Sequence, residues 1–129
     1  MDSKYAFGKT LDAAFAQAVE RVTQALAKEG FGVLSDIDVA ATLKKKVGLD
    51  MPPYRILGAC NPQFAHRALE AEPEIGTLLP CNVVLRAEGR QTRVDIMDPL
   101  AVMQLTGKPE IAGIAKEVRG RLDRVLASL

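Results

Sequence analysis

The feature that most constrains this chain is a β-hairpin signal in its second half. Two apolar, strand-like runs, at residues 78–86 and 91–97, are separated only by the short segment Ala87-Glu88-Gly89-Arg90. A tight turn of this kind connects two antiparallel strands. The pattern therefore predicts a sheet with an antiparallel region, and any sheet with an apolar face must be covered by other elements.

Two amphipathic patterns predict the helices that cover this sheet. The first has Thr10 as its predicted N-cap and Gly30 as its left-handed end, and its apolar stripe is Leu11, Phe15, Ala18, Val19, Val22 and Leu26. The second begins at Pro109, and its inward stripe is Ile111, Ile114, Ala115, Val118, Leu122, Val125 and Leu129.

Shorter signals predict the remaining elements. Strands are expected at residues 4–9, 31–37 and 54–60, and short helices are expected after Asp38, Asn61-Pro62 and Asp98-Pro99. The order strand, long helix, strand implies a right-handed crossover in which the first two strands run parallel. We therefore expect a two-layer α+β domain with a mixed, mainly antiparallel sheet and helices packed on one face.

Composition narrows the class of protein. The 129 residues are 48% hydrophobic and 26% charged, with a net charge of +1, which fits one soluble domain over residues 1–129. The absence of a basic field or an aromatic platform argues against nucleic-acid binding, and no apolar run is long enough to cross a membrane. Because no secretory signal is evident, we expect a cytoplasmic protein with reduced cysteines.

The two cysteines define the candidate site. They lie in two similar islands, Gly58-Ala59-Cys60-Asn61-Pro62 and Pro80-Cys81-Asn82, at the edges of predicted strands. If these strands pair in antiparallel fashion, the islands meet in space. We therefore expect a small ligand or a protein partner to bind at a cleft lined by Cys60, Asn61, Cys81, Asn82 and Arg55.

Several segments together resemble a known family. They are Gly30-Phe31-Gly32-Val33-Leu34, Asp36-Ile37-Asp38, residues 54–62, Ala65-His66-Arg67-Ala68-Leu69, residues 78–84 and Asp98-Pro99. Their combination resembles the bacterial and archaeal domain of unknown function numbered 302, over almost the whole chain. The resemblance implies a small two-layer α+β fold, a homodimer and no established activity. Cysteine at position 60 is typical of one subset of that family.

The cysteines admit two interpretations. Cys60 comes just before a helix start, where the helix dipole stabilises a thiolate, so it could act as a nucleophile or sulfur carrier that Cys81 resolves. Alternatively, both are small core residues, because Cys81 alternates with Leu79, Val83 and Leu85. Whether the protein is an enzyme stays open.

A metal site is the weakest alternative. Two thiols and the single histidine, His66, would suit zinc, but their spacing matches no standard motif. A partly exposed His66 paired with Glu70 explains the same residues, so no cofactor is expected.

Other polar residues have local explanations. Asn61 is accounted for as a helix N-cap, and Asn82 and Arg55 could simply occupy a sheet surface. On the last helix, Gly113, Gly120 and Ala127 lie opposite the inward stripe. Glycine is unfavourable inside a helix, so a closely approaching surface of a second copy would explain this face, and an exposed face without any packing requirement is the simpler alternative.

Overall fold

The computed structural model describes residues 3–129. The elements follow one another as β1 (Ala6–Leu11), α1 (Phe15–Lys28), β2 (Gly32–Asp38), α2 (Val39–Val47), β3 (Tyr54–Cys60), α3 (Pro62–Ala71), a 3-10 helix (Pro73–Leu78), β4 (Cys81–Glu88), β5 (Gln91–Met97), α4 (Pro99–Met103), a second 3-10 helix (Gln104–Thr106) and α5 (Pro109–Ala127). The hairpin predicted from the sequence is β4–β5.

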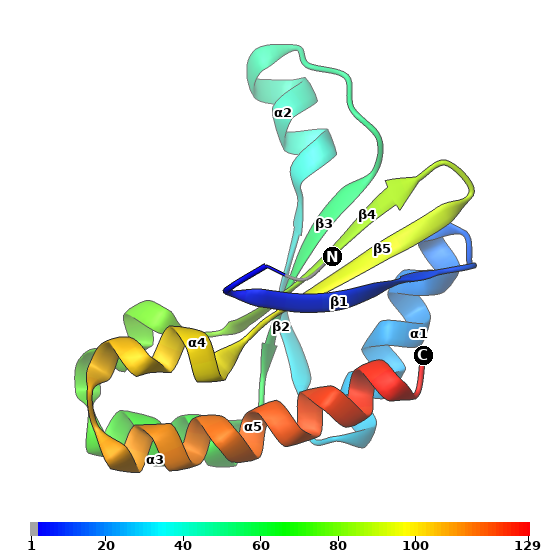
Figure 1. The fold of residues 1–129 in the computed structure, drawn as a ribbon. Coiled ribbons are helices and arrows are strands. Elements are labelled where there is room, and N and C mark those ends of the chain that lie inside the picture. The colour runs from blue at the N-terminus through cyan, green and yellow to red at the C-terminus, as the bar shows by residue number, and fades with distance from the viewer. Residues whose placement is uncertain (1–2) are drawn as a thin grey trace.

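The five strands form one sheet in the order β1-β5-β4-β3-β2 (Figure 1). All four neighbouring pairs are antiparallel, which confirms the α+β class and its mainly antiparallel sheet. The sheet is not mixed, however. The first two strands run in the same direction, as expected, but they occupy opposite edges because the other three strands lie between them.

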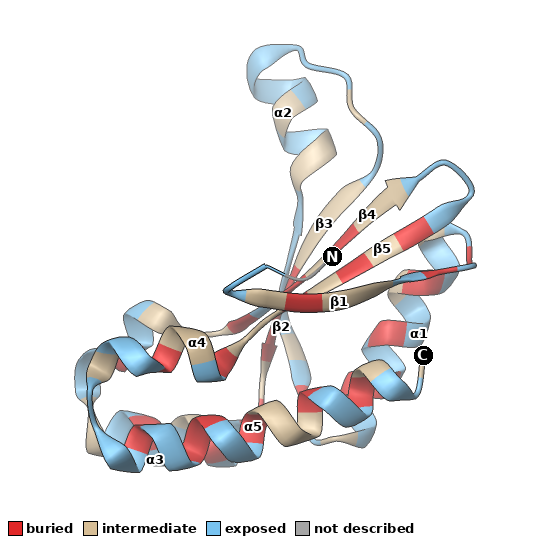
Figure 2. Cartoon of the chain, in the orientation of Figure 1, coloured by how far each residue is buried: buried red, intermediate tan, exposed pale blue. Residues whose placement is uncertain are grey.

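One face of the sheet carries the core, under α1 and α5 (Figure 2). The alternate residues Leu57, Val83, Leu85, Val94 and Ile96 on the three central strands are all buried on this face. The predicted stripe of α5 is buried too, apart from the half-buried Leu129. Each large apolar side chain removed from water in this way contributes roughly 1.5–3 kcal/mol.

The start of the first helix was predicted wrongly. Thr10 and Leu11 belong to β1, where they lie opposite Arg93 and Thr92, and α1 begins at Phe15. Leu11 is an apolar residue that suits a helix stripe and the buried face of a strand equally well. The pairing with β5 decides between them, and the hydroxyl of Thr92 donates to the carbonyl of Ala13 at 3.0 Å.

Both ends of α2 were predicted correctly from local sequence signals. The Asp38 carboxylate accepts a hydrogen bond from the backbone N–H of Ala41, and Gly48 ends the helix with a φ of +69°. This left-handed conformation favours glycine because other residues carry a Cβ that crowds the backbone. Despite its amphipathic sequence, α2 has no buried residue and stands away from the rest of the domain (Figure 1).

Of the element ends near prolines, one was predicted correctly and another was not. The third helix ends at Ala71, just before Pro73, as expected. The run from residue 78 does not start a strand, because Leu78 closes the first 3-10 helix and β4 begins at Cys81. Across residues 3–129, every helix is too short or too polar to cross a membrane.

Candidate functional site

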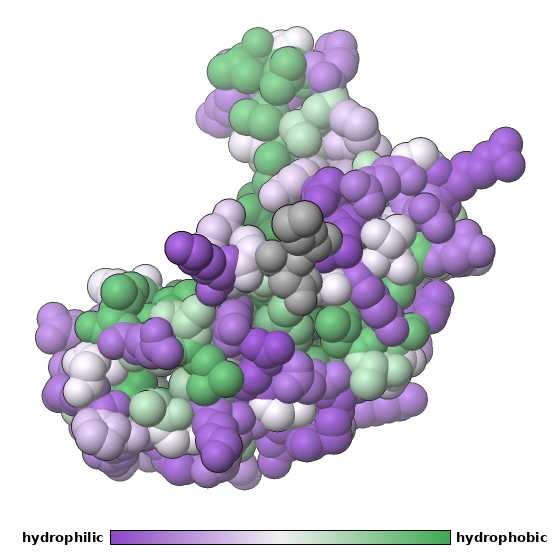
Figure 3. Space-filling view, in the orientation of Figure 1, coloured by the Kyte–Doolittle hydropathy of each residue, from purple (hydrophilic) through white to green (hydrophobic). Residues whose placement is uncertain are grey.

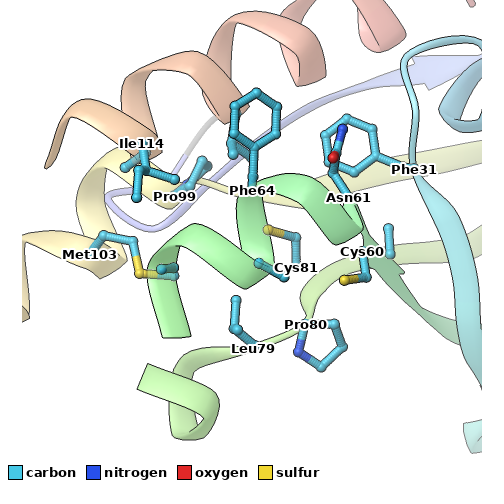
Figure 4. Close-up of a pocket in the computed structure, with 15 residues that line it drawn as sticks. Phe31, Cys60, Asn61, Phe64, Leu79, Pro80, Cys81, Pro99, Met103 and Ile114 are labelled. Carbon is cyan, nitrogen blue, oxygen red and sulfur yellow. The ribbon is translucent and has the colours of Figure 1, made fainter. Parts of the chain in front are cut away.

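An apolar pocket lies where β3 ends and β4 begins, below α3, α4 and α5 (Figure 4). Its cavity volume is about 40 Å³. The side chains around it are almost all hydrophobic: Phe31, Ala59, Cys60, Asn61, Phe64, Ala65, Ala68, Leu79, Pro80, Cys81, Pro99, Met103, Ile114, Ala115 and Val118.

Small residues on facing elements account for this space. Ala59 on β3, Ala65 and Ala68 on α3 and Ala115 on α5 all line the pocket. Larger side chains such as Phe64 and Met103 belong to the same wall. Protein interiors are normally packed as densely as organic crystals, so an unfilled apolar space is a distinct feature of this domain.

The predicted pairing of the two cysteine islands is correct. Ala59 lies directly opposite Cys81 in the β3–β4 ladder, so Cys60 and Cys81 are on adjacent strands. Because side chains alternate along a strand, the register directs Cys81 to the core face and Cys60 to the opposite one, which we call the open face. Figure 4 agrees: the Cys60 sulfur lies on the Pro80 side of the pocket, and the Cys81 sulfur lies on the Phe64 side.

The environment of each thiol opposes ionisation. Burial raises the pKa of Cys60, and burial together with the nearby Cys60 charge raises the pKa of Cys81 to about 11. This is the reverse of the lowered pKa expected beside a helix start. Both residues are free cysteines, and Cys81 is buried while Cys60 is half-buried. At neutral pH the site therefore presents protonated thiols.

Asn61 occupies the N-cap position of α3, but its side chain makes no cap hydrogen bond. Its Nδ2 instead donates to the backbone carbonyl of Glu29 at 3.5 Å, and the Nη1 of Arg121 donates to the same oxygen at 3.1 Å. The last carbonyls of a helix lack partners within the helix. The amide of Asn61, buried beside the pocket, thus joins the end of α1 to the start of α3.

Two predicted ligand-binding residues lie elsewhere. Asn82 is exposed on the open face, opposite Gly58. Arg55 lies at the far end of β3, where its guanidinium pairs with Asp36 on β2. Since a strand rises about 3.3 Å per residue, Arg55 is roughly 16 Å along the strand from Cys60. Of the five candidates, Cys60, Asn61 and Cys81 line the pocket.

The histidine is remote from the thiols as well. The Nε2 of His66 is 2.8 Å from a carboxylate oxygen of Glu70, and both side chains are exposed. Within residues 3–129, no three His, Cys, Asp or Glu side chains come together as metal ligands would. The combination of Cys60, Cys81 and His66 is therefore not assembled, and His66 has the partner expected from its helical spacing.

Sequence reasoning did not assign Phe31, Met103 and Ala115 to the site, although all three line it. They come from three separated segments, and each reads as an ordinary core residue in its own pattern. The only local signal was the helix start at Pro99, which brings Met103 towards the end of the sheet.

The architecture defines a class of small α+β domain in which a hairpin and three further strands form one sheet that carries a helical layer on one face. Residues 7–129 match the family model described as "Domain of unknown function DUF302", so the chain belongs to that family. The fold is also that of an uncharacterized conserved protein DUF302 from Bacillus stearothermophilus, at 31% identity and a TM-score of 0.90 over 98% of each chain. A search of the curated proteins finds no relative of this chain.

Proposed function

We propose that this protein is a ligand-binding module and that the apolar pocket is its binding site. The observation that carries the proposal is an apolar space of about 40 Å³ that no side chain fills. Apolar cavities take up small apolar molecules such as xenon. Binding would replace missing contacts along the cavity wall, and this gain in packing supplies the affinity.

The chemistry of the wall selects the ligand. The raised pKa values of Cys60 and Cys81 leave both thiols uncharged at neutral pH. The amide of Asn61 already donates to the carbonyl of Glu29. A wall without a charged group favours a small, neutral, apolar ligand, because a charged one would lose its hydration without compensation.

The proposal can be tested with xenon, which is small, neutral and apolar. We expect dissolved xenon to shift the methyl signal of Met103 in a saturable manner, measured by NMR on protein with labelled methionine methyl groups. Ala115→Leu fills the pocket and abolishes the shift. Ala112→Leu makes the same substitution on the exposed side of the same helix and leaves it intact.

The proposal would be refuted if the methyl signal of Met103 does not shift on addition of xenon. It would also be refuted if this signal shifts as much in Ala115→Leu as in the wild type. Ala68→Val, which occupies less of the space, serves as the second variant if Ala115→Leu does not fold.

The thiol-dependent alternative requires Cys60 to be ionised, whereas ligand binding in the apolar pocket requires it to be uncharged. A nucleophile or sulfur carrier requires a thiolate, and the raised pKa of Cys60 counts against one. We expect iodoacetamide to alkylate Cys60 more slowly than a free thiol at pH 7. Faster alkylation, followed by mass spectrometry of the modified peptide, would restore the alternative.

We further propose that the module is a homodimer in the cytoplasm and that its contact is formed by β2 and α2. Leu34 is 71% exposed, Val47 is 70% exposed, and Ile37 and Leu49 are each 50% exposed. Apolar residues gather on α2 at the top of the molecule (Figure 3). An edge strand presents unpaired N–H and C=O groups, so two copies of β2 can pair about a two-fold axis.

This proposal moves the contact from the face of α5 that the glycines indicated. Val47→Glu should dissociate the dimer, because it places a charge in the apolar contact. Leu105→Glu places the same charge at an even more exposed apolar residue on the second 3-10 helix and should leave the mass unchanged, as should Gly120→Arg. Sedimentation equilibrium measures the mass; a monomeric wild type, or a dimer that survives Val47→Glu, would contradict the proposal.

A further inference from the structure

We propose that a shallow groove along α5 binds the phosphate group of a small molecule. The groove has a volume of about 410 Å³ and is lined by Lys116, Glu117, Gly120, Arg121 and Arg124. Lys116, Gly120 and Arg124 are four residues apart in turn, so they form one stripe along the helix. The groove shares no residue with the apolar pocket, and the proposal stands independently of the function proposed above.

The charges in the groove are only partly compensated. Arg124 pairs with Glu29 at 2.9 Å, and Glu117 pairs with Arg67 at 3.5 Å. Within residues 3–129, no carboxylate lies within ion-pair distance of Lys116. Arg121 donates to a backbone carbonyl and not to a carboxylate. Lys116 and Arg121 thus leave two positive charges, which match the charge of about −1.5 to −2 on a phosphate group at pH 7.

Arg121 is held in place before any ligand arrives. Its Nη1 donates to the carbonyl of Glu29 at 3.1 Å, and its guanidinium lies 5.2 Å from the centre of the Phe64 ring. A guanidinium has five N–H donors, so this contact leaves others free for an anion. Because the side chain is already ordered, binding costs less conformational entropy than it would with a mobile arginine.

Gly120 provides the floor of the groove. A Cβ at this position would meet nothing within 4 Å, so packing against the rest of the domain does not require glycine. Glycine inside a helix costs about 1 kcal/mol relative to alanine. A bound group that approaches the helix backbone between Lys116 and Arg124 explains why a side chain is missing there.

The test uses inorganic phosphate and glycerol 3-phosphate as probes, each titrated at constant ionic strength against chloride. We expect saturable shifts of the Gly120 amide in NMR spectra of ¹⁵N-labelled protein. Lys116→Glu should weaken binding at least tenfold, and Gly120→Leu should abolish it by filling the floor. Lys45→Glu reverses the charge of another exposed, unpaired lysine on α2 and should change nothing.

The two probes distinguish the source of the phosphate group. Tighter binding of glycerol 3-phosphate supports a phosphorylated organic ligand, and equal binding supports recognition of the phosphate alone. The proposal is overturned if neither probe shifts Gly120 saturably, or if Lys45→Glu weakens binding as much as Lys116→Glu. The amide signals of β3–β5 report whether each variant is folded.

Discussion

The helices α2 and α5 have similar sequence signals and opposite surroundings. Each carries an apolar stripe, and each begins at a recognisable residue, after Asp38 in α2 and at Pro109 in α5. Six residues of α5 are buried against the sheet and its neighbouring helices, whereas α2 buries none (Figure 2). An amphipathic pattern thus states that a helix face will be covered, but not whether its own domain or another molecule covers it.

The apolar residues of the two helices therefore have different roles, because those of α5 stabilise the fold and those of α2 remain accessible to another molecule. Residues on α5 stabilise the domain through packing that exists in every copy. The stripe of α2 contributes little to the isolated chain and is available for a contact, which is why large apolar residues can remain exposed there.

The largest expected effect comes from making one substitution in both helices. Val125 is 1% exposed on α5, and Val47 is 70% exposed on α2. Val125→Ala should lower the free energy of unfolding by about 2–3 kcal/mol, because it removes buried methyl groups and leaves a cavity. Val47→Ala should change it by less than about 0.5 kcal/mol at low protein concentration. Equal losses in urea denaturation would show that α2 is packed in solution.

A similar decrease in the free energy of unfolding is expected at high pH, because Cys81 lies on the sheet face that α5 covers. The pKa of Cys81 is raised to about 11 from an ordinary value of 9.0, chiefly by burial. Between these values the unfolded chain ionises and the folded one does not, so stability present below pH 9 is lost as the pH rises to 11. The shift corresponds to about 2–3 kcal/mol. Denaturation of Cys81→Ala across this range should show a smaller pH dependence, and an unchanged slope would contradict the assignment.

A smaller effect is expected from removing the N-cap of α2, and it tests whether that helix is independent of the core. Removing the cap with Asp38→Ala should cost about 1 kcal/mol within α2. Because α2 has no buried residue, we expect local fraying and not global unfolding. Hydrogen exchange should therefore become about fivefold faster in α2 and stay unchanged in β3–β5. Faster exchange throughout the sheet would mean that α2 is coupled to the core.

The smallest expected effect concerns the ion pair beside α2. The hydrogen bond from Arg55 lowers the pKa of Asp36 below 3.8. Its stabilisation is present above pH 3.8 and disappears as the pH falls through the lowered pKa, and partial exposure keeps it small. Arg55→Gln should return the pKa of Asp36, followed by NMR, towards 3.8. Arg86→Gln breaks ion pairs to Glu88 and Asp95 instead, and should leave it unchanged.

Much of the fold could be predicted because its signals are local. Asp38 and Gly48 delimit α2, Pro62 and Pro109 begin their helices, and a glycine turn joins β4 to β5. Each acts within one turn of chain, so neighbouring residues contain the necessary information. Leu11 shows the limit of this approach, because its place in β1 depends on Thr92, far along the chain.

In the candidate site, too, some features could be predicted from the sequence and others could not. The islands at Cys60 and Cys81 could be brought together by assuming one antiparallel pairing. The sequence alone therefore determined most of the elements and the direction in which each amphipathic face points, whereas the adjacency of the two islands rested on a strand pairing that the tertiary structure decided. Only the tertiary structure decided the use of the Asn61 amide, since Glu29 is distant in sequence. It also decided the direction of the thiol pKa values, because burial depends on every element packed around a group.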